Sequence, residues 1–103
     1  VVESAVTTQL ADGMACRVAD QAALDILAPH LDHVVHVSDA EVAAAMHALY
    51  TDTHNAAEGA GAAALAAALQ EKERLAGQAV GVALTGGNVD AAVFARVLGG
   101  ASC

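Results

Sequence analysis

The sequence predicts an α/β fold in which helices and short parallel strands alternate in the order α, β, α, α, β, α. Short apolar runs at residues 33–37 and 80–84 are too brief for helices and rich in branched residues, which is typical of strands. The segments around them have apolar residues at helical spacing and helix start signals, so we expect helices there. Strands joined by helical crossovers pair in parallel, so we expect a right-handed connection between the two, with helices covering them.

Composition limits the size and the partners of this domain. A chain of 103 residues forms one domain with a modest core. Much of its apolar fraction of 56% is alanine, which favours helix but buries little area. The formal net charge of −8 argues against nucleic acid and anionic membranes as partners, because both attract basic patches. No stretch reads as a membrane span or a secretory leader, so we expect a cytoplasmic location.

The N-terminal third is expected to contain an irregular entry followed by one helix. Residues 1–18 read as loop or short strand, with a turn at Asp12-Gly13. Asp20 can cap the helix that follows, and Pro29 should end or kink it near Ala28. The apolar positions of this helix share one face: Leu24, Leu27 and Leu31.

The clearest helix start in the chain is the capping box that Ser38 forms with Glu41. Val37 and Val42 stand at the positions of a hydrophobic staple around it. The helix should continue to about His54, and its apolar face is formed by Val42, Met46, Leu49 and Thr53.

A second capping-box spacing, Asn55 to Glu58, precedes two glycines. Gly59 and Gly61 would then lie in the first turns of a helix, at a cost of about 1 kcal/mol each relative to alanine. Such a costly start suggests that another part of the backbone approaches closely. An alanine-rich helix over residues 62–76 should follow and end at Gly77.

The stretch after the second strand has the form of a strand end, a turn and a helix start. Gly86 and Gly87 leave the turn without side chains, and Asn88 is a good N-cap for a last helix over residues 89–98. Polar ligands bind at such helix starts and strand ends. On spacing alone, ordinary turn chemistry is the favoured interpretation, because no nucleotide-binding fingerprint is present. The last helix should bury Val93, Phe94 and Val97 and stop at Gly99-Gly100.

Cysteines and histidines offer little chemistry by their spacing. Cys16 and Cys103 have no partner at zinc or redox-motif spacing, so free or incidental thiols are expected. His33 and His36 should point to opposite faces of a strand, which disfavours a metal site. His54 is a candidate beside the predicted pocket, although a cation at a helix C-terminus is the more common role.

Four motifs in order carry a family resemblance: Ala11-Asp12-Gly13-Met14-Ala15, Val37-Ser38-Asp39-Ala40-Glu41, Glu58-Gly59-Ala60-Gly61-Ala62-Ala63 and Leu84-Thr85-Gly86-Gly87-Asn88-Val89-Asp90. With these motifs the chain resembles the C-terminal portion of pyridoxal-phosphate-dependent serine/threonine dehydratases, the fold-type-II enzymes that include threonine ammonia-lyases and share their scaffold with serine racemases. The resemblance implies that residues 1–103 form a single C-terminal segment of a larger catalytic domain. The complete enzyme would remove water and then ammonia from serine or threonine, leaving a 2-oxo acid.

The resemblance also implies a cofactor-binding set. Thr85 matches the position whose hydroxyl faces the pyridine nitrogen of pyridoxal 5′-phosphate, where relatives often have serine. Glu58 matches a carboxylate near the cofactor ring, although a capping role with Asn55 is an equally good interpretation from sequence alone. Gly86 and Asn88 complete the set. Asp12 would lie near the entrance, unless it is simply a turn residue.

By the same resemblance, the Schiff-base lysine, the Gly-rich phosphate loop and the acidic cation site belong upstream of Val1. Lys72 matches no family lysine and lies in a charge run typical of a solvated face. We therefore expect no catalytic residue and no metal ligand in this chain alone. Its expected partners are the missing N-terminal half or a second copy of itself, and an amino-acid substrate in the complete enzyme. The alternative is a non-catalytic interaction or assembly module.

Overall fold

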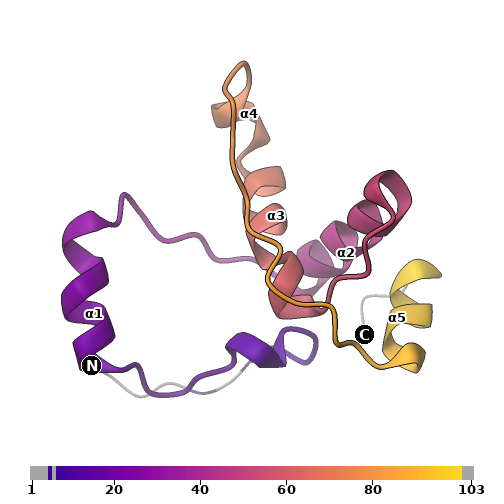
Figure 1. Cartoon of the computed structure of the whole chain (residues 1–103), viewed down its shortest axis with the longest axis horizontal. Helices are drawn as coiled ribbons and strands as arrows, with labels where there is room; N and C mark the ends of the chain where they lie inside the picture. The colour runs from indigo at the N-terminus through magenta and orange to yellow at the C-terminus, as the bar shows by residue number, and fades with distance from the viewer. Residues whose placement is uncertain (1–4, 6, 101–103) are drawn as a thin grey trace.

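Helices make up the regular structure of the computed structural model, which describes residue 5 and residues 7–100 (Figure 1). In chain order the elements are η1 (Asp12–Met14), α1 (Gln21–Leu27), η2 (Ala28–His30), α2 (Asp39–Thr53), α3 (Gly59–Gln70), α4 (Lys72–Leu75) and α5 (Ala91–Leu98). Within the described residues there is no strand, and only Val18 is an isolated bridge residue. Cys103 and most of residues 1–6 lie outside this description.

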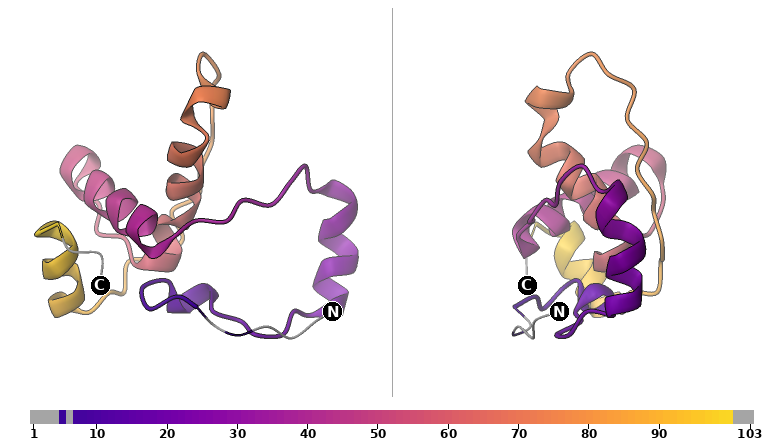
Figure 2. Two further views of the ribbon diagram at one scale, coloured as in Figure 1. Left: turned by 180° about the vertical axis from the view of Figure 1, so that it is seen from behind. Right: turned by 90° about the vertical axis from the view of Figure 1, so that its left-hand side faces the viewer.

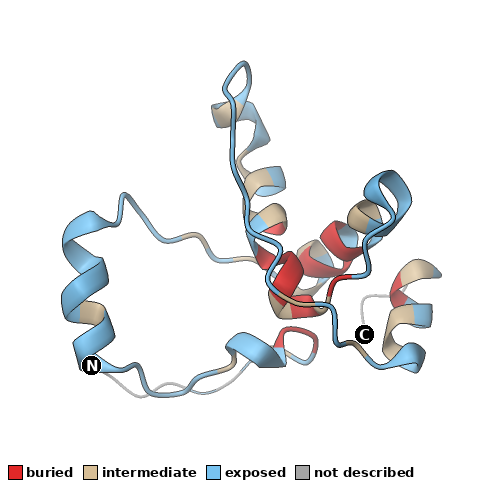
Figure 3. Cartoon of the chain, viewed as in Figure 1, coloured by how far each residue is buried: buried red, intermediate tan, exposed pale blue. Residues whose placement is uncertain are grey.

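The core lies where α2, α3 and α5 meet (Figure 3). Met46 and Val42 on α2 are almost completely buried, and Val97 joins them from α5. On α3 the buried positions are alanines and glycines, so the backbones of α2 and α3 can approach closely. The sequence predicted this apolar face of α2 and the inward side of α5, and both are confirmed except at Thr53, which is exposed.

The capping box predicted for α2 is present. The Glu41 N–H donates to the Ser38 hydroxyl at 3.1 Å, and the Ser38 N–H donates to the Glu41 carboxylate at 2.9 Å. Val37 packs on the core next to these residues. The helix ends where His54 takes a left-handed conformation with φ of 59°, as the sequence predicted to within a residue.

α1 also begins and ends where the sequence predicted. The Asp20 carboxylate accepts a hydrogen bond from the Ala22 N–H at 2.9 Å, and Pro29 lies in η2 directly after the helix. α1 contacts η2 and no other helix of the described chain. It therefore stands apart from the core as an arm (Figure 2).

The parallel strands predicted at residues 33–37 and 80–84 are not confirmed. Both segments are extended, and the second returns from α4 along α3 (Figures 1 and 2). Within the described residues no backbone hydrogen bond joins them. Parallel strands occur almost only inside larger covered sheets, and a lone pair is marginal in water, which accounts for the unpaired backbone.

Two predicted helix caps are wrong. α3 begins at Gly59 rather than after Asn55, and Glu58 makes no side-chain capping bond. Asn55 instead donates to the hydroxyl of Thr53 at 2.8 Å. α5 begins two residues later than predicted, with Asp90 in place of Asn88 before it, because the turn after Gly86 continues through residues 87–89 in non-helical conformation.

Glycines end the last two segments of helix, as predicted. Gly77 follows α4 with φ of 78°, and Gly100 follows α5 with φ of 94°. The alanine-rich helix is interrupted at Glu71, which separates α3 from α4. The expected turn at Asp12-Gly13 is present as η1. None of the helices in the described residues has the length and apolar character needed to cross a bilayer.

Candidate functional site

The first turn of α3 is the meeting point of three segments that are distant in the sequence. The Glu58 N–H donates to the Gly86 carbonyl at 3.0 Å, which fixes the end of the extended segment to the helix start. A methyl group added at Gly61 would lie within 3.0 Å of the Gly86 backbone. One added at Gly59 would meet the carbonyl of Leu10 equally closely. The close backbone approach predicted for both glycines is therefore confirmed.

The Glu58 carboxylate lies against Gly86. A side chain on Gly86 would come within 3.0 Å of Glu58 Oε1, so glycine is needed here for the carboxylate to take this position. Glu58 is half-buried, whereas Thr85 and Asn88 on either side of the glycine turn are exposed. Glu58 and Gly86 are thus brought into contact, and Thr85 is adjacent to them along the chain.

Thr85 lines a shallow hollow of about 460 Å³ on the face of α3. The surrounding residues are alanines of α3, the valines Val35 and Val37 of the first extended segment, and Gly13 and Met14 of η1. Thr85 is the one residue with a hydrogen-bonding side chain among them. The hollow is therefore shallow and mostly apolar, with a single hydroxyl in its lining.

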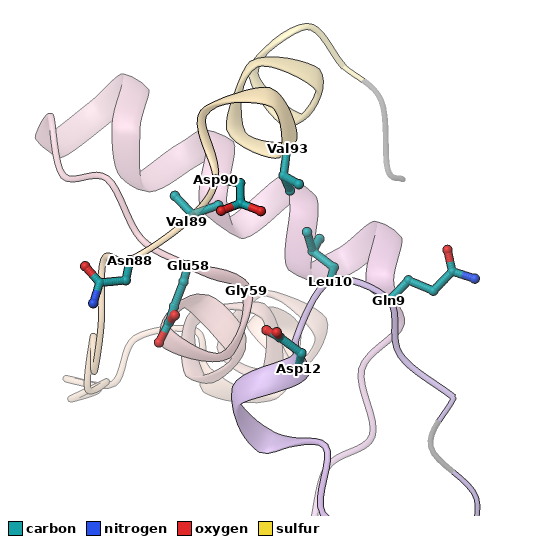
Figure 4. A pocket seen from close by; sticks show the side chains of 9 residues that line it. All are labelled: Gln9, Leu10, Asp12, Glu58, Gly59, Asn88, Val89, Asp90 and Val93. Atoms are coloured by element: carbon teal, nitrogen blue, oxygen red, sulfur yellow. The ribbon is translucent and has the colours of Figure 1, made fainter.

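A second, smaller hollow of about 200 Å³ lies between the segment that enters η1, the start of α3 and the start of α5 (Figure 4). Its acidic side chains are Asp12, Glu58 and Asp90, and Asn88 is at one end. Leu10 from the segment before η1 and Val93 from α5 are its apolar side chains above Asp12 in Figure 4. Three of the four residues predicted to bind the cofactor therefore line two different hollows, Thr85 the larger one and Glu58 and Asn88 the smaller one. Gly86 lines neither hollow but contacts Glu58 through its backbone.

Other candidate residues lie away from these hollows. His54 ends α2, and Lys72 is exposed on α4. His33 bridges Asp32 at 2.6 Å and Glu71 at 2.9 Å, and these carboxylates raise the pKa of its imidazole. The described residues hold no group of three or more potential metal ligands.

Sequence reasoning missed a polar cluster beside η1. Thr8 and Asp39 are hydrogen-bonded to each other at 2.5 Å across 31 positions of sequence. The Thr8 hydroxyl, followed by the N–H of Gln9, holds the pKa of the Asp39 carboxyl below its ordinary value. A threonine whose hydroxyl bonds the backbone a few residues later is a known local turn signal, but nothing in the sequence pointed to its distant partner.

Comparison with known proteins identifies the fold family. Residues 1–86 match the family described as pyridoxal-phosphate dependent enzyme. The chain belongs to this family. The resemblance drawn from the four motifs is therefore confirmed, and pyridoxal phosphate is the cofactor that the family implies for the complete enzyme.

Several curated relatives of this member of the pyridoxal-phosphate-dependent family are named as dehydratases or ammonia-lyases. It is 42% identical over 91 residues to phenylserine dehydratase of Ralstonia pickettii, matching 87% of this chain and 28% of that protein. It is 33% identical over 91 residues to L-threo-3-hydroxyaspartate ammonia-lyase of Saccharomyces cerevisiae, matching 88% of this chain and 28% of that protein. It is 32% identical over 89 residues to L-threonine ammonia-lyase of Thermotoga maritima, matching 86% of this chain and 22% of that protein. The chain thus spans about a quarter of the length of these relatives.

Proposed function

We propose that this chain is the C-terminal segment of the catalytic domain of a pyridoxal-phosphate-dependent lyase. The complete enzyme eliminates water from a β-hydroxy amino acid such as serine or threonine, and the resulting enamine becomes an imine. Addition of one water to this imine then releases ammonia and leaves a 2-oxo acid. The names of the relatives support this class, because phenylserine, 3-hydroxyaspartate and threonine all carry a hydroxyl on the β-carbon.

The hollow beside Thr85 is the observation that carries the proposal. An aromatic ring with one hydrogen-bonding nitrogen matches a shallow, mostly apolar hollow whose lining contains a single hydroxyl. A threonine hydroxyl can donate to a neutral pyridine nitrogen, and it does not give up its proton as a carboxylic acid would. When bound, pyridoxal phosphate supplies an electron sink for negative charge that develops on the substrate.

Glu58, Gly86 and Asn88 have supporting roles in this proposal. Gly86 lets the backbone and the Glu58 carboxylate come together next to Thr85. The carboxylate borders the second hollow, beside the turn that follows Thr85, where it can accept a hydrogen bond or hold a proton. Asn88 borders the second hollow together with Glu58 and offers an amide for orienting polar groups.

In this proposal the rest of the enzyme supplies the other groups that catalysis needs, including the lysine that attaches the cofactor. The existence of such a partner is supported by exposed apolar side chains on the two extended segments. These are Val34, Val80, Val82 and Leu84. Strands of the N-terminal part would pair with these segments and cover them. A second copy of the chain is the alternative occupant.

The test compares Thr85→Ala and Thr85→Ser in the complete enzyme. L-Serine and L-threonine are supplied in turn, and formation of the 2-oxo acid is followed. Thr85→Ala should lower kcat/KM by about 10- to 100-fold, because a ring nitrogen loses its partner in a dry site, and Thr85→Ser should stay near wild type. Thr51→Ala, an exposed threonine on α2, is the matched control. Equal activity of the alanine and serine variants would contradict the role of Thr85, and a wild-type enzyme that produces no 2-oxo acid would contradict the proposed function.

A further inference from the structure

A polar clamp joins the segment before η1 to the first residue of α2. The Thr8 hydroxyl donates to Asp39 Oδ1 at 2.5 Å, and the Gln9 N–H donates to Asp39 Oδ2 at 2.8 Å. The same hydroxyl accepts from the N–H groups of Leu10 at 3.2 Å and Ala11 at 2.9 Å. Both carboxylate oxygens of Asp39 and the single hydroxyl of Thr8 are thus used by one short stretch of backbone.

The clamped segment leads directly into η1, which borders both hollows. Asp12 of η1 borders the smaller hollow, together with Gln9 and Leu10 of the clamped segment, and Gly13 borders the larger one. A methyl group added at Gly13 would lie 2.9 Å from Ala60 Cβ and 3.8 Å from Glu58 Oε1, so the turn lies directly against the start of α3. A small displacement of η1 would therefore change the space around Glu58 and the hollow that Thr85 borders.

Apolar burial alone does not fix the position of this segment along the helix. Leu10 and Ala11 are buried, but burial is non-directional, so it tolerates a shift along α3. The hydrogen bonds of the clamp are directional. Asp39 lies at the N-terminus of α2, where the helix dipole favours its negative charge, so the anchor is itself well held.

We propose that Thr8 and Asp39 are positioning residues for the cofactor site. Neither borders a hollow, and they act through the backbone of residues 10–13. The inference rests on the proposed function, since it assigns a purpose to the wall that η1 forms around that site. It predicts that loss of the Thr8 hydroxyl loosens this wall and weakens the hold on pyridoxal phosphate without unfolding the core.

The experiment uses the complete enzyme with Thr8→Val, which keeps the shape of the side chain but removes the hydroxyl, and Thr8→Ser, which keeps the hydroxyl. Thr51→Val is the control for a threonine-to-valine change at an exposed site. Hydrogen exchange at the amides of Leu10 and Ala11 is measured without cofactor. The dissociation constant of pyridoxal phosphate is then measured by absorbance titration.

We expect Thr8→Val to speed exchange at both amides and to weaken pyridoxal-phosphate binding by about fivefold to tenfold, the effect of losing one hydrogen bond. The dissociation constants of Thr8→Ser and Thr51→Val for pyridoxal phosphate should stay within about twofold of the wild-type value. Should Thr8→Val fail to fold, Asp39→Asn is used, since it keeps an acceptor for Thr8 and loses the one for Gln9; weaker cofactor binding supports the inference in the same way.

If Thr8→Val binds pyridoxal phosphate as tightly as wild type, the positioning role is overturned, even if amide exchange is faster. The same holds for Asp39→Asn where that variant is used instead. Equal weakening in Thr8→Val and Thr8→Ser overturns it as well, because the hydroxyl would then be irrelevant. A wild-type enzyme that binds no pyridoxal phosphate refutes the proposed function and the inference with it. These results are distinguishable, since the first two require a wild-type enzyme that binds the cofactor.

Discussion

Replacing Gly61 with alanine sets two effects of known sign against each other. Alanine is favoured over glycine inside a helix by about 1 kcal/mol. The new methyl group would, however, lie within 3.0 Å of the Gly86 backbone, which cannot rotate away as a side chain could. Overpacking of this kind costs about 1 to 3 kcal/mol, and a clash with backbone belongs near the upper end. We expect a net loss of about 2 kcal/mol in the free energy of unfolding, taking the difference of these two effects.

The measurement is urea unfolding of the complete enzyme without cofactor, followed by far-ultraviolet circular dichroism. Gly81→Ala is the matched control, because an added methyl group there meets no atom within 4 Å. That variant should stay within about 0.5 kcal/mol of wild type. A Gly61→Ala protein as stable as wild type, or more stable, would show that the helix and the Gly86 turn can move apart freely, and the close approach would then have no energetic meaning.

Two further predictions concern α2 and the ion pairs near α4. Ser38→Ala should lower the free energy of unfolding by about 1 kcal/mol, since it removes the capping box with Glu41, and an unchanged urea midpoint would contradict this. The neighbours Asp32 and Glu71 raise the pKa of His33 above 6.5, so the stabilisation from its protonated ring is complete below that pH and is lost as pH rises through the raised pKa. The stability difference between wild type and His33→Gln should therefore shrink from about pH 5.5 to about pH 8.5, and a constant difference would argue against the ion pair.

Helix starts could be predicted where one side chain decides them locally. Asp20 and Ser38 cap their helices as expected, because the bond each forms lies within a single turn. Asn88 failed for the opposite reason: it has capping chemistry, but the turn that holds Gly86 against α3 keeps the backbone at Asn88 out of the helix. Tertiary contact overruled local preference at this point.

In the candidate site, too, local features could be predicted from the sequence and distant partners could not. Gly59 and Gly61 signalled close backbone approach because glycine is costly in a helix, and that cost can be read from the sequence. Nothing local identified the backbone they approach. The bond between Thr8 and Asp39 joins segments 31 positions apart, and a hydroxyl and a carboxylate at that distance in the sequence are indistinguishable from solvated residues. Strand pairing was also beyond the sequence, since it depends on neighbours outside each strand.

The isolation of α1 divides the chain into parts of unequal stability. A helix of seven residues that contacts only η2 among the described helices is too short to persist by its own hydrogen bonds. Ile26, which is 69% exposed, therefore adds little to cooperative unfolding, whereas Met46 is completely buried in the core. Local opening of this arm should cost far less than global unfolding, so proteases would cut there first and leave α2, α3 and α5 associated. Substitutions of apolar residues in the arm should therefore be tolerated, whereas substitutions of equally apolar buried residues of α2 should not.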